Sequence, residues 1–302
     1  MPPSSNPITP YLTSPLLPPL PHAFLRLVIA AYILLACLLT ILRPLFLGTP
    51  LYALRSFVYF TNLTYWSMGF YFLVSGLGTL EYALGVGKSG MGGGGRRGGK
   101  VIQVGGFRRM LVVRMEEWGP WARWVWGVWY TTVVSFPWLV TIVYWGVLYP
   151  GVWFEVEWDA WVNVSKHALN VLFSTVEIIF PRTTLPPLLH IPIILVLLVL
   201  YLSYALAISQ IFNFYVYFFL NPSSVGSWGV VVLFVLGIAL VACLLFVVVR
   251  GFVLMRMLIF ARLHGEVLEN GEEEDARKGV LGEGEWDVEM GLLGGEDEDE
   301  IE

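Results

Sequence analysis

The stretch that decides the fold is residues 183–249, TTLPPLLHIPIILVLLVLYLSYALAISQIFNFYVYFFLNPSSVGSWGVVVLFVLGIALVACLLFVVV. These 67 residues between Arg182 and Arg250 contain no Asp, Glu, Lys or Arg. A helix needs about 20 apolar residues to cross a hydrocarbon layer about 30 Å thick. The stretch is therefore long enough for two crossings, and it predicts an integral membrane protein.

The composition of the whole chain agrees with this prediction. Of its 302 residues, 57% are hydrophobic and only 14% are charged, whereas soluble domains carry about 25% charged residues. Uncharged apolar runs recur along the chain and predict an all-α, polytopic bundle of about six transmembrane helices. The predicted spans are residues 24–42, 57–80, 124–149, 166–180, 189–216 and 226–249.

The two ends of the chain differ from the bundle in composition. Residues 1–23 are rich in proline and are expected to form an irregular tail before the bundle, which extends over residues 24–262. The C-terminal tail, residues 263–302, is strongly acidic, with 16 acidic residues against Arg277 and Lys278. Such a composition predicts a solvated, disordered segment. The sequence does not identify a protein partner for this tail.

The distribution of basic residues predicts the topology. The connection near residues 84–114 is Gly-rich and is the most basic loop, which places it in the cytosol. Six crossings then leave both termini in the cytosol, in either the endoplasmic reticulum or the plasma membrane. Arg43 and Arg55 fall on the non-cytosolic side, against the general bias of basic residues.

The fourth predicted span and the residues before it carry a periodic polar pattern. Asn163, His167, Asn170, Ser174 and Glu177 recur at spacings of 4, 3, 4 and 3 residues, which places all of them on one face of a helix. Polar side chains are costly in contact with lipid, so this stripe should face the bundle interior or a water-filled cavity. It serves either as hydrogen bonding between helices or as part of a reactive site.

The second predicted span has a similar stripe. Its members recur at spacings of 3, 4, 3 and 4 and are Thr61, Thr64, Met68, Tyr71 and Ser75. Spans two and four both start from the non-cytosolic side, so Thr61 and His167 are expected at similar depth. A hydroxyl and an imidazole at one level can act as a nucleophile and a base. The other histidines lie elsewhere along the predicted topology, which leaves His167 as the candidate base.

The sequence offers no pattern that would hold a metal or another cofactor. The two cysteines, Cys37 and Cys243, each lie within an apolar run, so neither a disulfide framework nor a metal cluster is expected. The expected partners are the membrane and a lipid substrate, and no interaction with nucleic acid is expected.

Three segments of the chain resemble the androgen-induced membrane protein family, and the similarity extends roughly over residues 24–260. The segments are YFTNLTYWSMGFYF at 59–72, VNVSKHALNVLFSTVEIIF at 162–180 and FYVYFFLNPSS at 214–224. The family's pattern of an Asn four residues before a catalytic His and a Glu ten residues after it is matched by Asn163, His167 and Glu177.

The resemblance implies a multi-pass threonine hydrolase that cleaves fatty acid esters of hydroxy fatty acids. The nucleophile would then be Thr61 or Thr64, with Thr61 better preserving the aromatic residues ten and eleven positions later. The shared helix face, and not the resemblance, suggests that Asn163 or Asn170 orients His167 or stabilises an oxyanion, and Glu177 is a further candidate for a supporting role.

The sequence thus favours a membrane lipid esterase with Thr61 and His167 as its catalytic residues. The alternative is a transporter or channel in which Glu177 and His167 relay protons or bind a cation. A third hypothesis is a non-catalytic scaffold that signals through the acidic tail.

Overall fold

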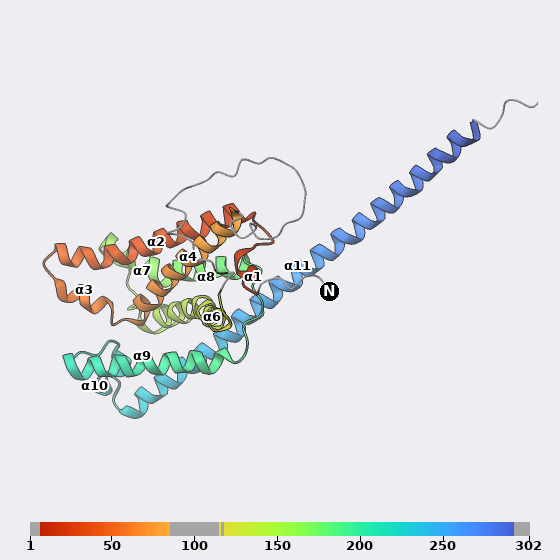
Figure 1. Cartoon of the computed structure of the whole chain (residues 1–302). Coiled ribbons are helices and arrows are strands. Elements are labelled where there is room, and N and C mark those ends of the chain that lie inside the picture. The colour runs from red at the N-terminus through yellow and green to blue at the C-terminus, as the bar shows by residue number, and fades with distance from the viewer. Residues whose placement is uncertain (1–6, 85–114, 116–117, 293–302) are drawn as a thin grey trace, which may run out of the picture. The chain divides into compact units, whose positions relative to one another are not determined.

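The structure, a computed structural model, describes residues 7–84, 115 and 118–292, with side chains only up to residue 263 (Figure 1). Over these residues the chain is all-helical, as the sequence predicts. The helices are α1 (Thr9–Leu12), α2 (Pro19–Phe46), α3 (Pro50–Ser56), α4 (Phe60–Ala83), α6 (Pro120–Val143), η2 (Tyr144–Leu148), α7 (Glu157–Val164), η3 (Ser165–Leu169), α8 (Asn170–Ile179), α9 (His190–Phe212), η4 (Phe218–Leu220), α10 (Pro222–Val225) and α11 (Trp228–Leu292). The predicted Gly-rich loop, from residue 85 to residue 114, lies outside the described residues.

Four helical segments are long and apolar enough to cross a membrane: Pro19–Phe46, Pro120–Leu148, His190–Phe212 and Trp228–Leu263. They coincide with the first, third, fifth and sixth predicted spans. The second and fourth predicted spans are also helical, as α4 and as the succession α7–η3–α8, but polar residues interrupt their apolar character. Four helices are therefore candidate membrane spans by length and composition, and the number six is not confirmed.

The helices expose apolar side chains in a way that suits lipid as the solvent. On α9, Val196, Val199 and Leu200 are between 55% and 60% exposed. A large apolar surface of this kind is rare on soluble monomers, where it would be covered by a partner or a membrane. Polar groups, by contrast, are concentrated between α2, α4, α6 and α8.

The N-terminal segment is more ordered than the sequence suggested. Instead of an irregular tail up to residue 23, the chain forms the short helix α1, and α2 already begins at Pro19. Ile8 and Leu12 are buried in the main core. Proline is well tolerated in the first turn of a helix, because the amide it lacks would have no partner there. The proline-rich segment therefore contains the first turn of α2 as well as irregular chain.

The chain divides into two units, and the second unit begins at Met255. Helix α11 extends from Trp228 into the acidic segment and ends at Leu292. The disorder expected for the acidic tail stays a prediction. Residues 293–302 lie outside the described part of the chain.

The main core is formed by α2, α4 and α6, and α8 packs against α6. Helices α2 and α4 approach closely because α4 presents glycines at their contact: a Cβ on Gly76 would lie 2.9 Å from Cγ of Leu27. Small residues allow this kind of close packing between membrane helices. Two π-helical turns interrupt the regular geometry, η2 at the end of α6 and η3 before α8. They lie next to the candidate site.

Candidate functional site

The polar stripe of the fourth predicted span lies between helices and faces inward. His167, Asn170, Ser174 and Glu177 are all buried, and Asn163 is half-buried. Its middle part is held by α6. Ser174 Oγ donates to the carbonyl of Val134 at 2.9 Å.

Asn170 is equally well held. Its Oδ1 accepts a hydrogen bond from the Thr141 hydroxyl at 3.0 Å, and its Nδ2 donates to the carbonyl of Pro137 at 3.4 Å. Its side-chain amide is thus engaged on both sides with α6, and this part of the stripe serves as interhelical hydrogen bonding.

His167 lies in the π-helical turn η3 and contacts a residue of the other π-helical turn. Its ring stacks on that of Tyr144, with centroids 3.6 Å apart and planes at 8°. The Tyr144 hydroxyl donates to Asn163 Oδ1 at 2.7 Å, so Asn163 fixes the ring that supports His167. Single π-helical turns within α-helices are frequent at functional sites.

One ring nitrogen of His167, Nδ1, is buried and has no hydrogen-bond partner among the described residues. The backbone carbonyl of the same residue accepts a hydrogen bond from Trp145 Nε1 at 2.9 Å, which further fixes the π-helical turn. Buried polar atoms in native proteins are nearly always paired. An unpaired ring nitrogen is therefore either a cost to the fold or a group awaiting a ligand.

Thr61 lies at the start of α4 and lines an apolar cavity of about 140 Å³. The walls come mostly from aliphatic residues of α6, α9 and α11, among them Val140, Leu198 and Ile238. A cavity of this chemistry suits a hydrocarbon chain, and the Thr61 hydroxyl is one of few polar groups beside it.

Two tyrosines provide the other polar groups of this cavity, and the sequence analysis assigned them no role. The backbone N–H of Phe60 donates to the hydroxyls of Tyr201 at 3.0 Å and Tyr217 at 3.1 Å. Thr61 and Tyr217 both line this cavity. Burial raises the pKa of Tyr217, which therefore stays protonated and keeps a proton to donate. The segment FYVYFFLNPSS is one of the three that carry the resemblance. The sequence alone does not show that its Tyr217 contacts the start of α4.

The other candidate nucleophile has a different environment. The Thr64 hydroxyl donates back to the carbonyls of Phe60 and Thr61, both at 3.0 Å. It lines a separate cavity of about 230 Å³ that also contains Ser67 and Thr132. Back-bonding to the preceding turn is a common structural use of threonine in membrane helices. Of the two threonines, Thr61 is the one that lines the apolar cavity.

No hydrogen bond joins Thr61 and His167 among the described residues. Thr61 lines its cavity together with Val140 and Val143 of α6, and His167 stacks on Tyr144, the first residue of η2. Helices α4 and η3, which carry the two residues, are packed against each other. Catalytic hydrogen bonds are often absent or long without substrate and form when it binds.

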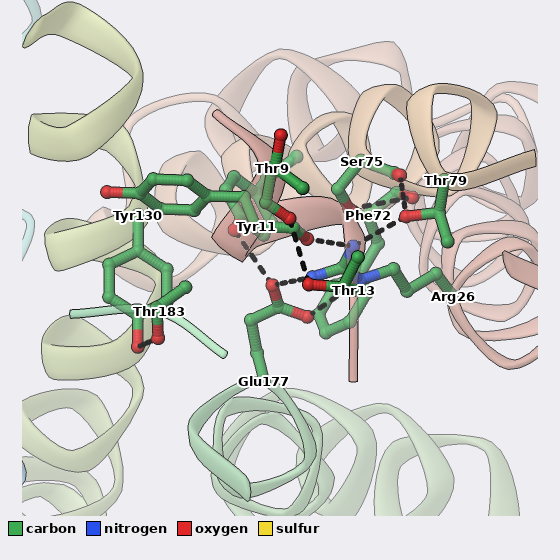
Figure 2. Close-up of polar contacts among 11 residues, drawn as sticks. Thr9, Tyr11, Thr13, Arg26, Phe72, Ser75, Thr79, Tyr130, Glu177 and Thr183 are labelled. Atoms are coloured by element: carbon green, nitrogen blue, oxygen red, sulfur yellow. Dashed lines mark hydrogen bonds and ion pairs between the residues drawn. The ribbon is translucent and has the colours of Figure 1, made fainter. Parts of the chain in front are cut away.

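Glu177, at the far end of the stripe, belongs to a different cluster (Figure 2). It forms a fully buried ion pair with Arg26 of α2, in which Arg26 Nε donates to Oε2 at 3.1 Å and Nη2 donates to Oε1. The Tyr71 hydroxyl donates to Oε1 at 2.8 Å. Arg26 Nη1 in turn donates to the Tyr11 carbonyl and to the Thr79 hydroxyl, both at 2.7 Å.

This cluster ties α1, α2, α4 and α8 together and separates Glu177 from His167. Ten residues of helix correspond to about 15 Å, so the carboxylate does not contact the imidazole. Both oxygens of the Glu177 carboxylate are thus engaged by Arg26, and one of them also by Tyr71. The sequence analysis missed Arg26, although a lone arginine within an apolar span is itself an indication of a buried partner.

The residues described contain no group of three or more His, Cys, Asp or Glu side chains arranged to hold a metal ion. Comparison with protein-family models, with curated proteins and with solved structures finds no match to this chain.

Proposed function

We propose that the protein is a membrane lipid esterase that hydrolyses fatty acyl esters, with Thr61 as nucleophile and His167 as base. The observations that support this proposal are that Thr61 lines an apolar cavity and that His167 has a buried ring nitrogen without a partner among the described residues. An acyl chain in the cavity would bring its ester carbonyl beside the Thr61 hydroxyl.

The reaction follows from these groups. Thr61 Oγ1 attacks the carbonyl carbon while His167 takes the hydroxyl proton, and the carbonyl oxygen becomes an oxyanion. The bond to the alcohol oxygen then breaks, and His167 returns the proton to the departing alkoxide. Water attacks the acyl-threonine and releases the fatty acid, which restores Thr61. The sum is one ester and one water giving one acid and one alcohol.

The oxyanion donor in this proposal is Tyr217, in place of the asparagines considered from the sequence. Its hydroxyl is protonated, fixed by the Phe60 amide and adjacent to Thr61. Donors placed at a developing oxyanion contribute strongly to catalysis of acyl transfer. Asn163 acts here as a positioning residue, because it reaches His167 only through the Tyr144 ring.

The main alternative, a transporter or channel that uses Glu177 and His167, is less well supported. A proton relay requires the two groups to exchange protons directly or through water. Glu177 is instead enclosed by Arg26 and Tyr71, about three helical turns from His167.

A fluorophosphonate probe on the purified protein tests the proposal. We expect Thr61→Ala to abolish labelling, Thr61→Ser to retain it, and peptide mapping to place the adduct on residue 61. Thr64→Ala is the matched control, because it removes a hydroxyl one turn away that only bonds to its own helix. His167→Gln should slow labelling by roughly 10²- to 10⁴-fold. Undiminished labelling of Thr61→Ala would remove Thr61 from the mechanism.

A further inference from the structure

A second polar cavity lies on the opposite side of the start of α4. It has a volume of about 370 Å³ and lies between the end of α2, α3, the start of α4 and α7. Asn62 lines this cavity, whereas the preceding residue, Thr61, lines the apolar one. The two cavities are therefore separate spaces on either side of one helical turn.

The walls of this cavity carry an excess of positive charge. Arg43, Arg55 and Lys166 line it, against the single carboxylate of Asp159. Among the described side chains, no carboxylate lies within salt-bridge distance of Arg43, Arg55 or Lys166. Three cations against one carboxylate leave the cavity with a net positive charge, which favours an anionic ligand.

The two arginines are held by aromatic rings. The Arg43 guanidinium lies 4.7 Å from the centroid of the Trp158 ring, and that of Arg55 lies 4.6 Å from the Phe214 ring. Stacking fixes the plane of a guanidinium while leaving its N–H edge available to a carboxylate or a phosphate. Both side chains are thus oriented without using the donors that would bind an oxyanion.

Lys166 is the third cation and is almost fully enclosed, with 6% of its surface exposed. Its ammonium group has three donors, and within the described residues it makes one hydrogen bond, to the Thr40 hydroxyl at 3.3 Å. Burying an ammonium group is costly unless it is paired. An oxyanion in the cavity would supply the missing acceptors.

The surroundings of the cavity indicate that this anion carries a hydrocarbon chain. The connection from α2 to α3 exposes apolar side chains next to it, with Phe46 at 85%, Leu47 at 65% and Leu51 at 67%. Leu47 is itself a lining residue. The connection follows a helix long enough to span a membrane, at the depth where lipid headgroups lie.

We infer that this cavity binds the oxyanion headgroup of a lipid, a carboxylate or a phosphate, through Arg43, Arg55 and Lys166. The inference does not depend on esterase activity. It also gives a reason for Arg43 and Arg55 to lie on the side of the membrane where the distribution of basic residues disfavours them. Two arginines retained against that bias serve a local ligand.

Equilibrium binding to the full-length protein in a neutral detergent tests the inference, with radiolabelled oleate, phosphatidic acid, phosphatidylcholine and inorganic phosphate as four separate probes. The test variant is Arg43→Gln/Arg55→Gln, which changes exposed side chains and leaves the core intact. The matched control is Arg182→Gln/Arg262→Gln, which also removes two exposed positive charges but lies outside the cavity.

We expect saturable binding of oleate or phosphatidic acid, weakened about tenfold or more in the test variant, since hydrogen bonds to charged groups are the strong ones. The control variant should bind as the wild type does. Preference between oleate and phosphatidic acid identifies the headgroup. Inorganic phosphate binding as tightly as either lipid would refute a lipid site, and so would equal loss in the two variants or no saturable binding of any anionic lipid.

Discussion

The buried ion pair between Arg26 and Glu177 allows the strongest quantitative prediction. Arg26→Met removes the donors to both Glu177 oxygens and leaves the carboxylate with the Tyr71 hydroxyl alone. Breaking a buried ion pair by removing one partner costs about 3–5 kcal/mol, because the remaining charge is uncompensated. Glu177→Met leaves Arg26 in the same state and should cost a similar amount. If the two effects were independent, the double variant would lose about 8 kcal/mol.

The double variant should lose much less than that sum. Arg26→Met/Glu177→Met leaves no buried charge, and the principal groups without partners are the Tyr71 hydroxyl and the Tyr11 carbonyl. Each buried unsatisfied group costs about 1–3 kcal/mol, which gives about 4 kcal/mol in total. The expected coupling energy is therefore about 4 kcal/mol, or about a thousandfold in the unfolding equilibrium.

Unfolding by sodium dodecyl sulfate in mixed micelles, followed by circular dichroism, measures the four free energies of this cycle. The folded fraction of each variant should still react with the fluorophosphonate probe at the wild-type rate, because Glu177 lies outside the reactive site. An additive cycle would refute the assignment of Glu177 to a structural ion pair. A selective loss of labelling in the folded Glu177→Met variant would return this residue to the mechanism.

Four side chains near the candidate site give further expectations. Tyr217→Phe should slow fluorophosphonate labelling by roughly 10²-fold with little change in the melting temperature, because it removes one oxyanion donor; an unchanged rate would exclude that role. Tyr144→Phe and Asn163→Ala each break the hydrogen bond that fixes the ring beneath His167. Each should slow labelling, and the double variant should be no slower than the more affected single variant, whereas multiplied effects would show separate roles. His167→Leu should abolish labelling yet leave the free energy of unfolding unchanged or higher, because it removes a buried nitrogen without a partner. A marked loss of stability would instead indicate that His167 serves the fold.

The all-helical architecture with candidate membrane spans could be predicted from the sequence because it depends on the hydrophobicity of long continuous segments. Uncharged runs of about 20 residues have few alternatives to a transmembrane helix. The positions of α2, α6, α9 and α11 follow from such runs. The short helix α1 could not be predicted in this way, since it is stabilised by burial of Ile8 and Leu12 in a core made by distant helices.

Only the part of the candidate site that lies on a single helix face could be predicted from the sequence. Spacing identified the face that carries His167 and Glu177, because helical periodicity is a local property. Spacing could not predict that Arg26, which lies 151 residues before Glu177, forms an ion pair with its carboxylate. Nor could it place Tyr217 beside Thr61, because that pairing depends on how the loop after α9 folds back over the start of α4.

Hydrogen bonding along the stripe distinguishes His167 from the other buried polar residues on the same face. Asn170, Ser174 and Glu177 all have protein partners on neighbouring helices, and such pairing repays the cost of holding polar groups inside a membrane bundle. His167 is on the same face, equally enclosed, and its Nδ1 has no such partner in the described structure. If its only role were packing, an apolar side chain would fill the same space against Tyr144 at lower cost. The proposed function assigns this nitrogen a role, as the base that takes the proton of the Thr61 hydroxyl.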